Sequence, residues 1–247
     1  MHFYTFFPKE YDDMQSDFFD DAIVIMIDVL RASTTICASF FNGTKEVIPF
    51  VSPKEAYNYY LNREDKENYI LSGEINLELP KGFMLGNSPN ENKKDIVQNK
   101  SIILTTSNGT KIFKTATSAL YRIIGSFVNI DAVVSFIIKN VEKKYIKKIV
   151  LLCAGEKGLL CLEDILCAGM FIYKLVPNYN NNSFSDTAKL AVDFFNFNKN
   201  NFNDILENAQ HSKELYNLGF ENDILFAGTL NKCPVIPFVN KHNIISL

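Results

Sequence analysis

Two adjacent carboxylates, Glu163 and Asp164, open a helical pattern shortly after an apolar run over 148–153. Asp28 and Glu156 follow apolar runs in the same way. Acids in the first turn of a helix stabilise it by about 0.3–1 kcal/mol, so helix capping is one interpretation. Crowded carboxylates also favour a bound cation, and an all-oxygen site suits Mg²⁺. The pattern therefore predicts a Mg²⁺ site at this strand end, with capping as the alternative.

Arg31 and Glu74 are two further charged candidates. Arg31 lies three residues after Asp28. Together they could hold a divalent metal and clamp a phosphate or sulfonate, or they could form a structural ion pair between neighbouring loops. Glu74 stands in a long segment punctuated by Gly, Pro and Asn. A loop of that length inside a compact domain is often functional, although an ordinary surface excursion is the alternative.

Small-polar turns supply a second kind of candidate. The stretch TTSNGTK over 105–111 offers hydroxyls, an amide and a glycine before a helical pattern, which is a possible anion site, although such a turn also simply caps helices. It lacks the spacing of a Walker A loop. Side chains such as Ser and Asn after a strand usually cap the next helix, yet they could also contact an anion. The residues expected to bind an anionic ligand are Arg31, Thr106, Asn108, Gly109, Ser126, Asn129 and Gly155.

The elements that must position these residues are four apolar runs, at 22–28, 101–105, 120–124 and 148–153, each followed by a helical pattern. After the second run, the helix is expected over 112–120. Near-continuous apolar strands are typical of parallel sheets, which helices cover on both faces. We therefore expect an α/β fold with three α/β/α layers and a largely parallel or mixed sheet. Ligands bind outside the carboxyl ends of such strands, where all four turns lie.

The C-terminal third has weaker signals. We expect one helix over 186–195 and another over 204–218, because Ser, Asn and Asp precede them as caps. Two short strands are expected at 224–228 and 235–239, the second at a sheet edge because it contains a proline. The whole chain, 1–247, is expected to form a single domain, with the polar segment 178–186 as a boundary between two subdomains.

Composition excludes several classes of function. The net charge of −3 gives no basic field for nucleic acid, and no apolar run approaches the ~20 residues of a membrane span. The N-terminal stretch contains acids and an early proline where a signal peptide would be apolar, so we expect a cytoplasmic protein. The five cysteines contain no CxxC pair. The 21 phenylalanines would permit a homodimer interface without demonstrating one.

Several familiar catalytic arrangements are missing from the sequence. No cysteine is followed six residues later by arginine, as a cysteine phosphatase requires, and Asp28-Val29-Leu30 lacks the second acid of a dehalogenase-type phosphatase. Neither GxSxG nor HExxH occurs. The three histidines share no metal-binding spacing, and His211 lies in a helical pattern, where packing is a commoner role than catalysis.

Six motifs occur in order along the chain. They are DVLRASTT at 28–35, GE at 73–74, GFMLGNSP at 82–89, LTTSNGT at 104–110, GSFVN at 125–129 and CAGEKGLLCLEDILCAG at 153–169. Together they resemble the 2-phosphosulfolactate phosphatase family, and the likeness continues through His211 and Asp223 in the tail.

The resemblance implies a Mg²⁺-dependent hydrolase that removes phosphate from (2R)-2-phospho-3-sulfolactate and gives 3-sulfolactate. In methanogens this step leads towards coenzyme M. The resemblance also implies an α/β fold distinct from that of the dehalogenases. A different phosphorylated 2-hydroxy acid as substrate, or a non-catalytic module that binds small anions, are the alternatives.

On this reading, Asp28, Glu163 and Asp164 are the expected metal ligands, and Asp28, Glu74 and Asp164 are the expected catalytic acids. Phosphoryl transfer depends mostly on positioning and charge stabilisation, which these residues could supply. Whether Asp28 attacks phosphorus or a water molecule does so is left open by the sequence.

Overall fold

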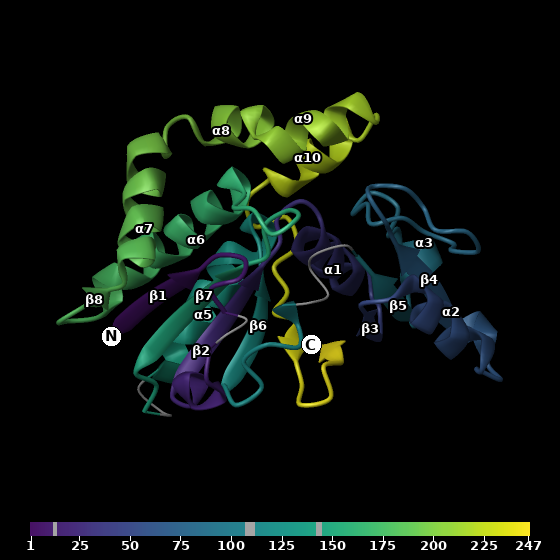
Figure 1. Ribbon diagram of the computed structural model, residues 1–247, viewed down its shortest axis with the longest axis horizontal. Helices are drawn as coiled ribbons and strands as arrows, with labels where there is room; N and C mark the ends of the chain where they lie inside the picture. The colour runs from purple at the N-terminus through teal and green to yellow at the C-terminus, as the bar shows by residue number, and fades with distance from the viewer. Residues whose placement is uncertain (12–13, 107–111, 142–144) are drawn as a thin grey trace.

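The computed structural model spans residues 1–247 and describes residues 1–11, 14–106, 112–141 and 145–247. Its described strands form one ten-stranded sheet in the order β4-β5-β3-β10-β9-β6-β2-β7-β1-β8 (Figure 1). The strands are β1 (His2–Phe6), β2 (Ala22–Ile27), β3 (Glu46–Phe50), β4 (Tyr69–Gly73), β5 (Ser101–Thr105), β6 (Tyr121–Gly125), β7 (Lys148–Cys153), β8 (Ser183–Phe184), β9 (Phe238–Val239) and β10 (Ile245–Ser246). Pairing is parallel except at β9 and β10, which run antiparallel to their neighbours. The predicted mixed, largely parallel sheet is confirmed.

Helices cover both faces of this sheet. They are α1 (Ala32–Phe41), α2 (Pro53–Leu61), α3 (Lys94–Val97), α5 (Ile130–Val141), α6 (Leu162–Leu175), α7 (Asp186–Asn198), α8 (Phe202–Asn208), α9 (Gln210–Asn217) and α10 (Glu221–Ala227). Short 3-10 helices occur at Ser16–Phe19, Lys66–Asn68, Phe127–Asn129 and Val176–Asn178.

Strand β2 shows why the layers form. All six of its residues are buried. Ile23 and Ile25 point to one face, where they join a core cluster with α5, α6 and α7, whereas Val24 and Met26 point to the other face and pack with α1. A strand buried on both faces needs apolar residues at every position, so the continuous apolar run follows from the three-layer architecture.

Figure 1 shows which elements lie at the two sides of the molecule and which lie at one end of the strands. Elements α2, α3, β4 and β5 gather at one side, and β1, β8 and α7 lie at the other. The consecutive helices α8, α9 and α10 lie together at the top of the view, over one end of the strands. The C-terminal helices thus close over the strand ends where the polar turns stand.

Two of the helices predicted from the sequence are wrong. Residues 113–120 form turns in place of a helix, because the Arg122 guanidinium donates to the carbonyls of Phe113 and Thr115. The helix expected over 204–218 is two helices, α8 and α9, because Ala209 between them has an extended backbone with ψ 149°. In both places tertiary contacts or a local break override helical propensity.

The expected strand at 224–228 belongs instead to helix α10 and the turn after it. A short apolar run does not by itself separate a strand from a buried helix turn. Ile224 and Ala227, three residues apart, are buried on one side, whereas Leu225 is 59% exposed. The pattern is thus one helical face.

Strand β9 was expected at an edge because of Pro237, but it lies inside the sheet between β6 and β10. Pro237 precedes β9, and its carbonyl accepts a hydrogen bond from the backbone N–H of Ile124 at 2.9 Å. Its missing N–H therefore does not interrupt the ladder. The helix predicted over 186–195 is confirmed as α7, whose cap Ser185 accepts from the backbone N–H of Ala188.

No helix in the described part of the chain combines the length and the apolar character that crossing a membrane requires. All described strands belong to one sheet, and the segment expected as a boundary contains β8, which pairs with β1. The single domain, its subdomain boundary, the cytoplasmic location and the homodimer stay predictions.

Candidate active site

Three of the polar turns meet at one edge of the sheet. Asp28 follows β2, Glu74 follows β4, Thr106 follows β5, Ser126 follows β6 and Gly155 lies just beyond β7. Strands β2, β6 and β7 run in the same direction, so their carboxyl ends share an edge, whereas β4 and β5 lie beyond the antiparallel strands β9 and β10 and run the opposite way. Asp28, Ser126 and Gly155 thus lie along one edge, the position where open α/β sheets bind ligands. The strand directions do not place Thr106 at that edge, and Glu74 joins the site through its ion pair with Arg31.

Asp28 is fixed at the tip of β2 and is only 6% exposed. The Ser33 side chain donates to its backbone carbonyl, and Asp28 Oδ1 accepts a hydrogen bond from the backbone N–H of Ala32 at 3.2 Å. Burial raises the pKa of Asp28 to about 7, against the opposing effects of His211 and of the Ala32 hydrogen bond. Asp28 is therefore a carboxyl group that changes its protonation state near neutral pH.

Asp164 connects two loops of the edge. Its Oδ1 accepts from the backbone N–H of Val29 and its Oδ2 from that of Gly155, both at 2.9 Å. Burial, then the charges of Glu163 and Asp28, raise the pKa of Asp164 well above its ordinary value. Both oxygens thus position backbone, although a carboxylate retains further lone pairs for a cation.

Gly155 belongs to the same loop and has a backbone conformation that suits glycine, with φ +59°. A Cβ atom there would lie 2.0 Å from the carbonyl oxygen of Leu159 and 2.5 Å from Pro8 Cγ. The loop can therefore bring the Gly155 N–H to Asp164 only because this residue has no side chain. This is why the apolar run of β7 is followed by small residues.

Arg31 is held between two acids from distant segments. Its Nη2 donates to Glu74 Oε2, and its Nη1 donates to Asp223 Oδ2 at 2.8 Å. The ring of Phe220 lies 4.3 Å from the guanidinium carbon. Arg31 is 3% exposed, and its Nε has no hydrogen-bond partner among the described residues. The predicted candidates Arg31 and Glu74 are thus brought together as a buried ion pair.

Asp223, in α10, is a central residue of this network to which the sequence analysis assigned no role. Besides Arg31 it accepts hydrogen bonds from Ser88 Oγ at 2.6 Å and from Asn90 Nδ2 at 2.9 Å. Asn87 from the same loop donates to Glu74 Oε1 at 2.8 Å. The sequence did contain a signal for these residues, because Asn87 and Ser88 fall in the GFMLGNSP motif, which Asn90 follows directly, and Asp223 lies in the tail of the resemblance.

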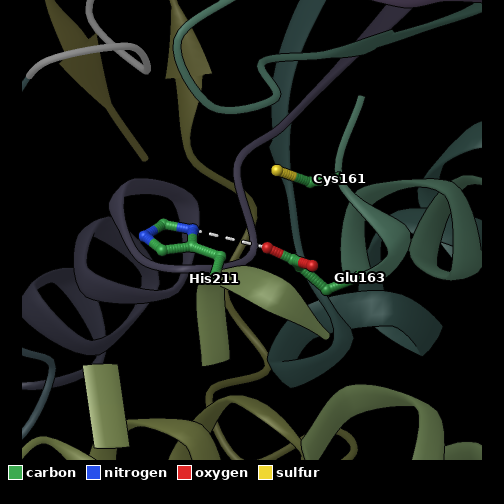
Figure 2. A group of neighbouring side chains, drawn as sticks. All are labelled: Cys161, Glu163 and His211. Atoms are coloured by element: carbon green, nitrogen blue, oxygen red, sulfur yellow. Dashed lines mark ion pairs between the residues drawn. The ribbon is translucent and has the colours of Figure 1, made fainter. Parts of the chain in front are cut away.

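His211 and Cys161 also enter the site. His211, in α9, places Nδ1 3.4 Å from Glu163 Oε1 (Figure 2). Burial alone would lower the pKa of His211, but Glu163 outweighs it, with help from Glu156 and Asp28, and raises it to about 9. Cys161 lies beside them at the start of α6. The three residues line one cavity of about 210 Å³, together with Glu156 and Gln210.

The remaining predicted anion ligands fall into three groups. Ser126 and Asn129 are fully buried: Ser126 Oγ lies 2.8 Å from Thr34 Oγ1, and the amide of Asn129 is bonded to the backbone of Ser126, Ile124 and Val235. Their observed contacts are structural, and their role as ligands stays a prediction. Thr106 is buried at the end of β5. Asn108 and Gly109 lie outside the described residues.

The predicted donor set has the chemistry of a site for a divalent cation, but among the described residues it is Cys161, Glu163 and His211 whose ligand atoms lie within 4.8 Å of one another. Asp28, Glu163 and Asp164 are all buried carboxylates, and Glu163 Oε2 has no hydrogen-bond partner among the described residues. Burial raises the pKa of Asp28 and of Asp164, and His211 and the backbone hydrogen bonds offset that effect only in part. Hard oxygen donors of this kind suit Mg²⁺. These residues would hold the ion.

Comparison with known proteins gives a consistent set of matches. A sequence model of the family described as 2-phosphosulpholactate phosphatase matches residues 9–242. A probable 2-phosphosulfolactate phosphatase of Thermotoga maritima is 38% identical over 86% of this chain and 87% of its own length. Proteins with the same description from Caldanaerobacter subterraneus and Clostridium tetani are 36% and 32% identical, over 87% and 92% of this chain and 86% and 93% of their own lengths.

Proposed function

Because the chain belongs to the 2-phosphosulfolactate phosphatase family, we propose that it is a phosphoric monoester hydrolase that acts on (2R)-2-phospho-3-sulfolactate. The observation that carries the proposal in the structure is the convergence of Asp28, Glu163 and Asp164 at the carboxyl edge of the sheet. A substrate with phosphate, sulfonate and carboxylate groups needs positive charge around it. A bound cation, with Arg31 nearby, would supply part of that positive charge.

Asp28 is assigned to proton transfer. Hydrolysis forms a bond between the water oxygen and phosphorus and breaks the bond between phosphorus and the C2 oxygen, which leaves as the hydroxyl of sulfolactate. One proton leaves the water and one reaches the departing oxygen. In the metal-free protein burial raises the pKa of Asp28 to about 7. A bound cation would lower that pKa, so Asp28 would be ionised and able to accept the proton of the water.

Arg31 is assigned to the anionic groups of the substrate. Glu74 and Asp223 hold two of its nitrogens, so the guanidinium is oriented before a ligand arrives. Its Nε–H, which has no partner among the described residues, remains as a donor. In this proposal Glu74 positions Arg31. Asp164 positions the loops that contain Val29 and Gly155, and neither acid reacts with the substrate.

Mg²⁺ is proposed as the cofactor, held by Asp28, Glu163 and Asp164. When bound it would supply positive charge against the phosphoryl oxygens, where negative charge gathers during transfer. The chain's own residues would orient the phosphate, exclude water and move the proton.

The test is phosphate release from a panel of phosphorylated 2-hydroxy acids that includes 2-phospho-3-sulfolactate, measured with Mg²⁺ and with EDTA. We expect metal-dependent release that is fastest with 2-phospho-3-sulfolactate. Faster release from another member would keep the reaction and replace the substrate. No release from any member by folded protein in Mg²⁺ would leave a non-catalytic anion-binding module.

A matched pair of variants separates enzyme from binder. Asp28→Asn should lower the rate by at least about a hundredfold, the typical contribution of acid–base catalysis. Asp193→Asn changes an exposed acid in α7 that pairs with Lys189, and it should retain the wild-type rate. Equal rates for the two variants would remove Asp28 from the reaction.

A further inference from the structure

Three different donor types meet on one side of the candidate site. The Cys161 thiol, the Glu163 carboxylate and the His211 imidazole each offer a ligand atom, and these atoms lie within 4.8 Å of one another. Figure 2 shows the sulfur, a carboxylate oxygen and a ring nitrogen directed into a common space. Sulfur and nitrogen donors together suit a borderline or soft transition-metal ion, unlike the all-oxygen set assigned to Mg²⁺.

Two helix starts deliver these donors. Cys161 precedes the first residue of α6 in an extended conformation, and Glu163 lies in the first turn of that helix. His211 lies in the first turn of α9, far away in the sequence. Glu163 is 1% exposed and His211 6% exposed. The ligand-bearing positions therefore belong to packed elements, which hold a site more accurately than a free loop would.

One separation in this group is compatible with tetrahedral coordination. Zn²⁺ binds imidazole nitrogen and carboxylate oxygen at about 2.0–2.2 Å, which places two such ligands about 3.4 Å apart on a tetrahedron. His211 Nδ1 and Glu163 Oε1 lie 3.4 Å apart. The Cys161 sulfur lies within 4.8 Å of the other two ligand atoms. A sulfur bound about 2.3 Å from the metal would lie about 3.6 Å from its neighbouring ligand atoms, so it would have to move closer by at most about 1 Å. Rotation of one short side chain covers that shift.

The pocket also contains polar atoms that lack partners. Glu163 Oε2 and His211 Nε2 are buried, and neither has a hydrogen-bond partner among the described residues. Both residues line the cavity of about 210 Å³, as does Cys161. A metal ion that binds Cys161 would displace the thiol proton.

We propose that Cys161, Glu163 and His211 bind a thiophilic divalent transition-metal ion such as Zn²⁺ or Co²⁺, with a fourth position open to the cavity. Because Glu163 also belongs to the set assigned to Mg²⁺, the two ions compete. The competition between the two ions rests on the proposed Mg²⁺ site, whereas the site formed by Cys161, Glu163 and His211 does not. A chain with this site would be sensitive to traces of zinc.

The probe is Co²⁺ added to metal-free protein, followed by absorption spectroscopy. A cobalt–thiolate bond gives an intense near-ultraviolet charge-transfer band, which we expect in the wild-type protein. Cys161→Ser should abolish the band, and His211→Ala should weaken Co²⁺ binding by at least about tenfold, while both variants melt as folded proteins. Cys233→Ala is the matched control, because Cys233 is buried in the core cluster of the opposite sheet face, and it should retain the band.

Two results would overturn the site: no charge-transfer band in folded wild-type protein at saturating Co²⁺, or an unchanged band in Cys161→Ser. Excess Mg²⁺ should reduce the band, and a band that Mg²⁺ leaves unchanged would overturn the competition. None of these readouts involves catalysis. A protein that binds Co²⁺ through Cys161 but releases no phosphate in Mg²⁺ would disprove the proposed function and keep the metal site.

Discussion

At the scale of single residues, Asp28 and Asp164 show how one side-chain type takes two roles. Asp164 uses both oxygens to hold the backbone of neighbouring loops. Asp28 accepts one longer hydrogen bond, from Ala32, and faces other acids, Glu74 and Glu156, besides His211. Burial raises the pKa of both acids, but the hydrogen bonds differ, so Asp164 supports the backbone of two loops whereas Asp28 keeps most of its acceptor capacity.

The raised pKa of Asp28 gives a prediction about stability in EDTA. Because the folded pKa, about 7, exceeds the ordinary 3.8, the folded protein binds more protons than the unfolded chain between these values. Stability therefore falls as pH rises through that window. Asp28→Asn removes this cost, so its Tm at pH 8 should exceed that of the wild type by at least about 2–4 °C, the effect of about 1 kcal/mol in a domain of this size.

Thermal melts in EDTA at pH 4, 6 and 8 measure this difference. The gap between Asp28→Asn and the wild type should grow with pH and be smallest at pH 4. The exposed control Asp193→Asn should show no such trend. A gap that is equal at all three pH values would contradict a raised pKa for Asp28.

Asp223 gives a second prediction at this scale. Asp223→Asn would remove one of the two charges that hold Arg31 and place an amide group near its Nη1. Breaking a buried ion pair typically costs about 3–5 kcal/mol. We expect a lower Tm and, because Arg31 loses its orientation, a kcat/KM at least about tenfold lower. Chemical denaturation together with phosphate release measures both, and wild-type values for both would refute a positioning role.

At the scale of elements, the loop between β7 and α6 determines the geometry of the site. It brings the N–H of Gly155 to Asp164 and places Cys161 and Glu163 at the start of α6. The loop between β2 and α1 meets it through the N–H of Val29. Two strand–helix connections are thus joined by one buried carboxylate, so a change in either loop alters both.

Two glycines with positive φ test this connection. Gly155→Ala would place a Cβ 2.0 Å from a backbone oxygen, whereas Gly219→Ala, at φ +80°, would meet nothing within 4 Å. Gly219→Ala should cost only the conformational strain, on the order of 1 kcal/mol. Gly155→Ala should cost several times more and should also lower phosphate release. Denaturant unfolding of both variants gives the comparison, and equal losses would show that the close approach has no effect.

At the scale of the whole molecule, three cations among the described residues pair with acids of this edge: Arg31 with Glu74 and Asp223, His211 with Glu163, and the exposed Lys157 with Glu156. The helices α8–α10 cover that end of the sheet (Figure 1). They supply His211 and Asp223, so the site joins the two ends of the sequence. A cation in this site would bind the folded chain far more strongly than the unfolded one.

Mg²⁺ should therefore stabilise the protein as a whole. At a concentration a hundred times its Kd, a ligand that binds only the folded state adds about 2.7 kcal/mol. We expect the Tm to rise with Mg²⁺ at pH 8 and to rise little at pH 4, where the carboxylates are protonated. A Mg²⁺ titration followed by calorimetry measures this shift, and an unchanged Tm at pH 8 would argue against a Mg²⁺ site.

The sequence predicted much of the central sheet because the signals there are local. Continuous apolar runs identified β2, β5, β6 and β7, and the parallel architecture then placed Asp28, Glu163 and Asp164 at a common edge. Short apolar segments such as 224–228 were ambiguous, because a single turn of helix and a short strand bury similar residues.

The sequence by itself thus determined the α/β class, the family resemblance and the acids of the edge. Only the tertiary structure decided that Asp223 would hold Arg31 and that His211 would face Glu163, since Arg31 and Asp223 are 192 residues apart in the chain. Such contacts depend on how α8–α10 pack over the strand ends. That packing is fixed by burial summed over many residues, which no local spacing pattern records.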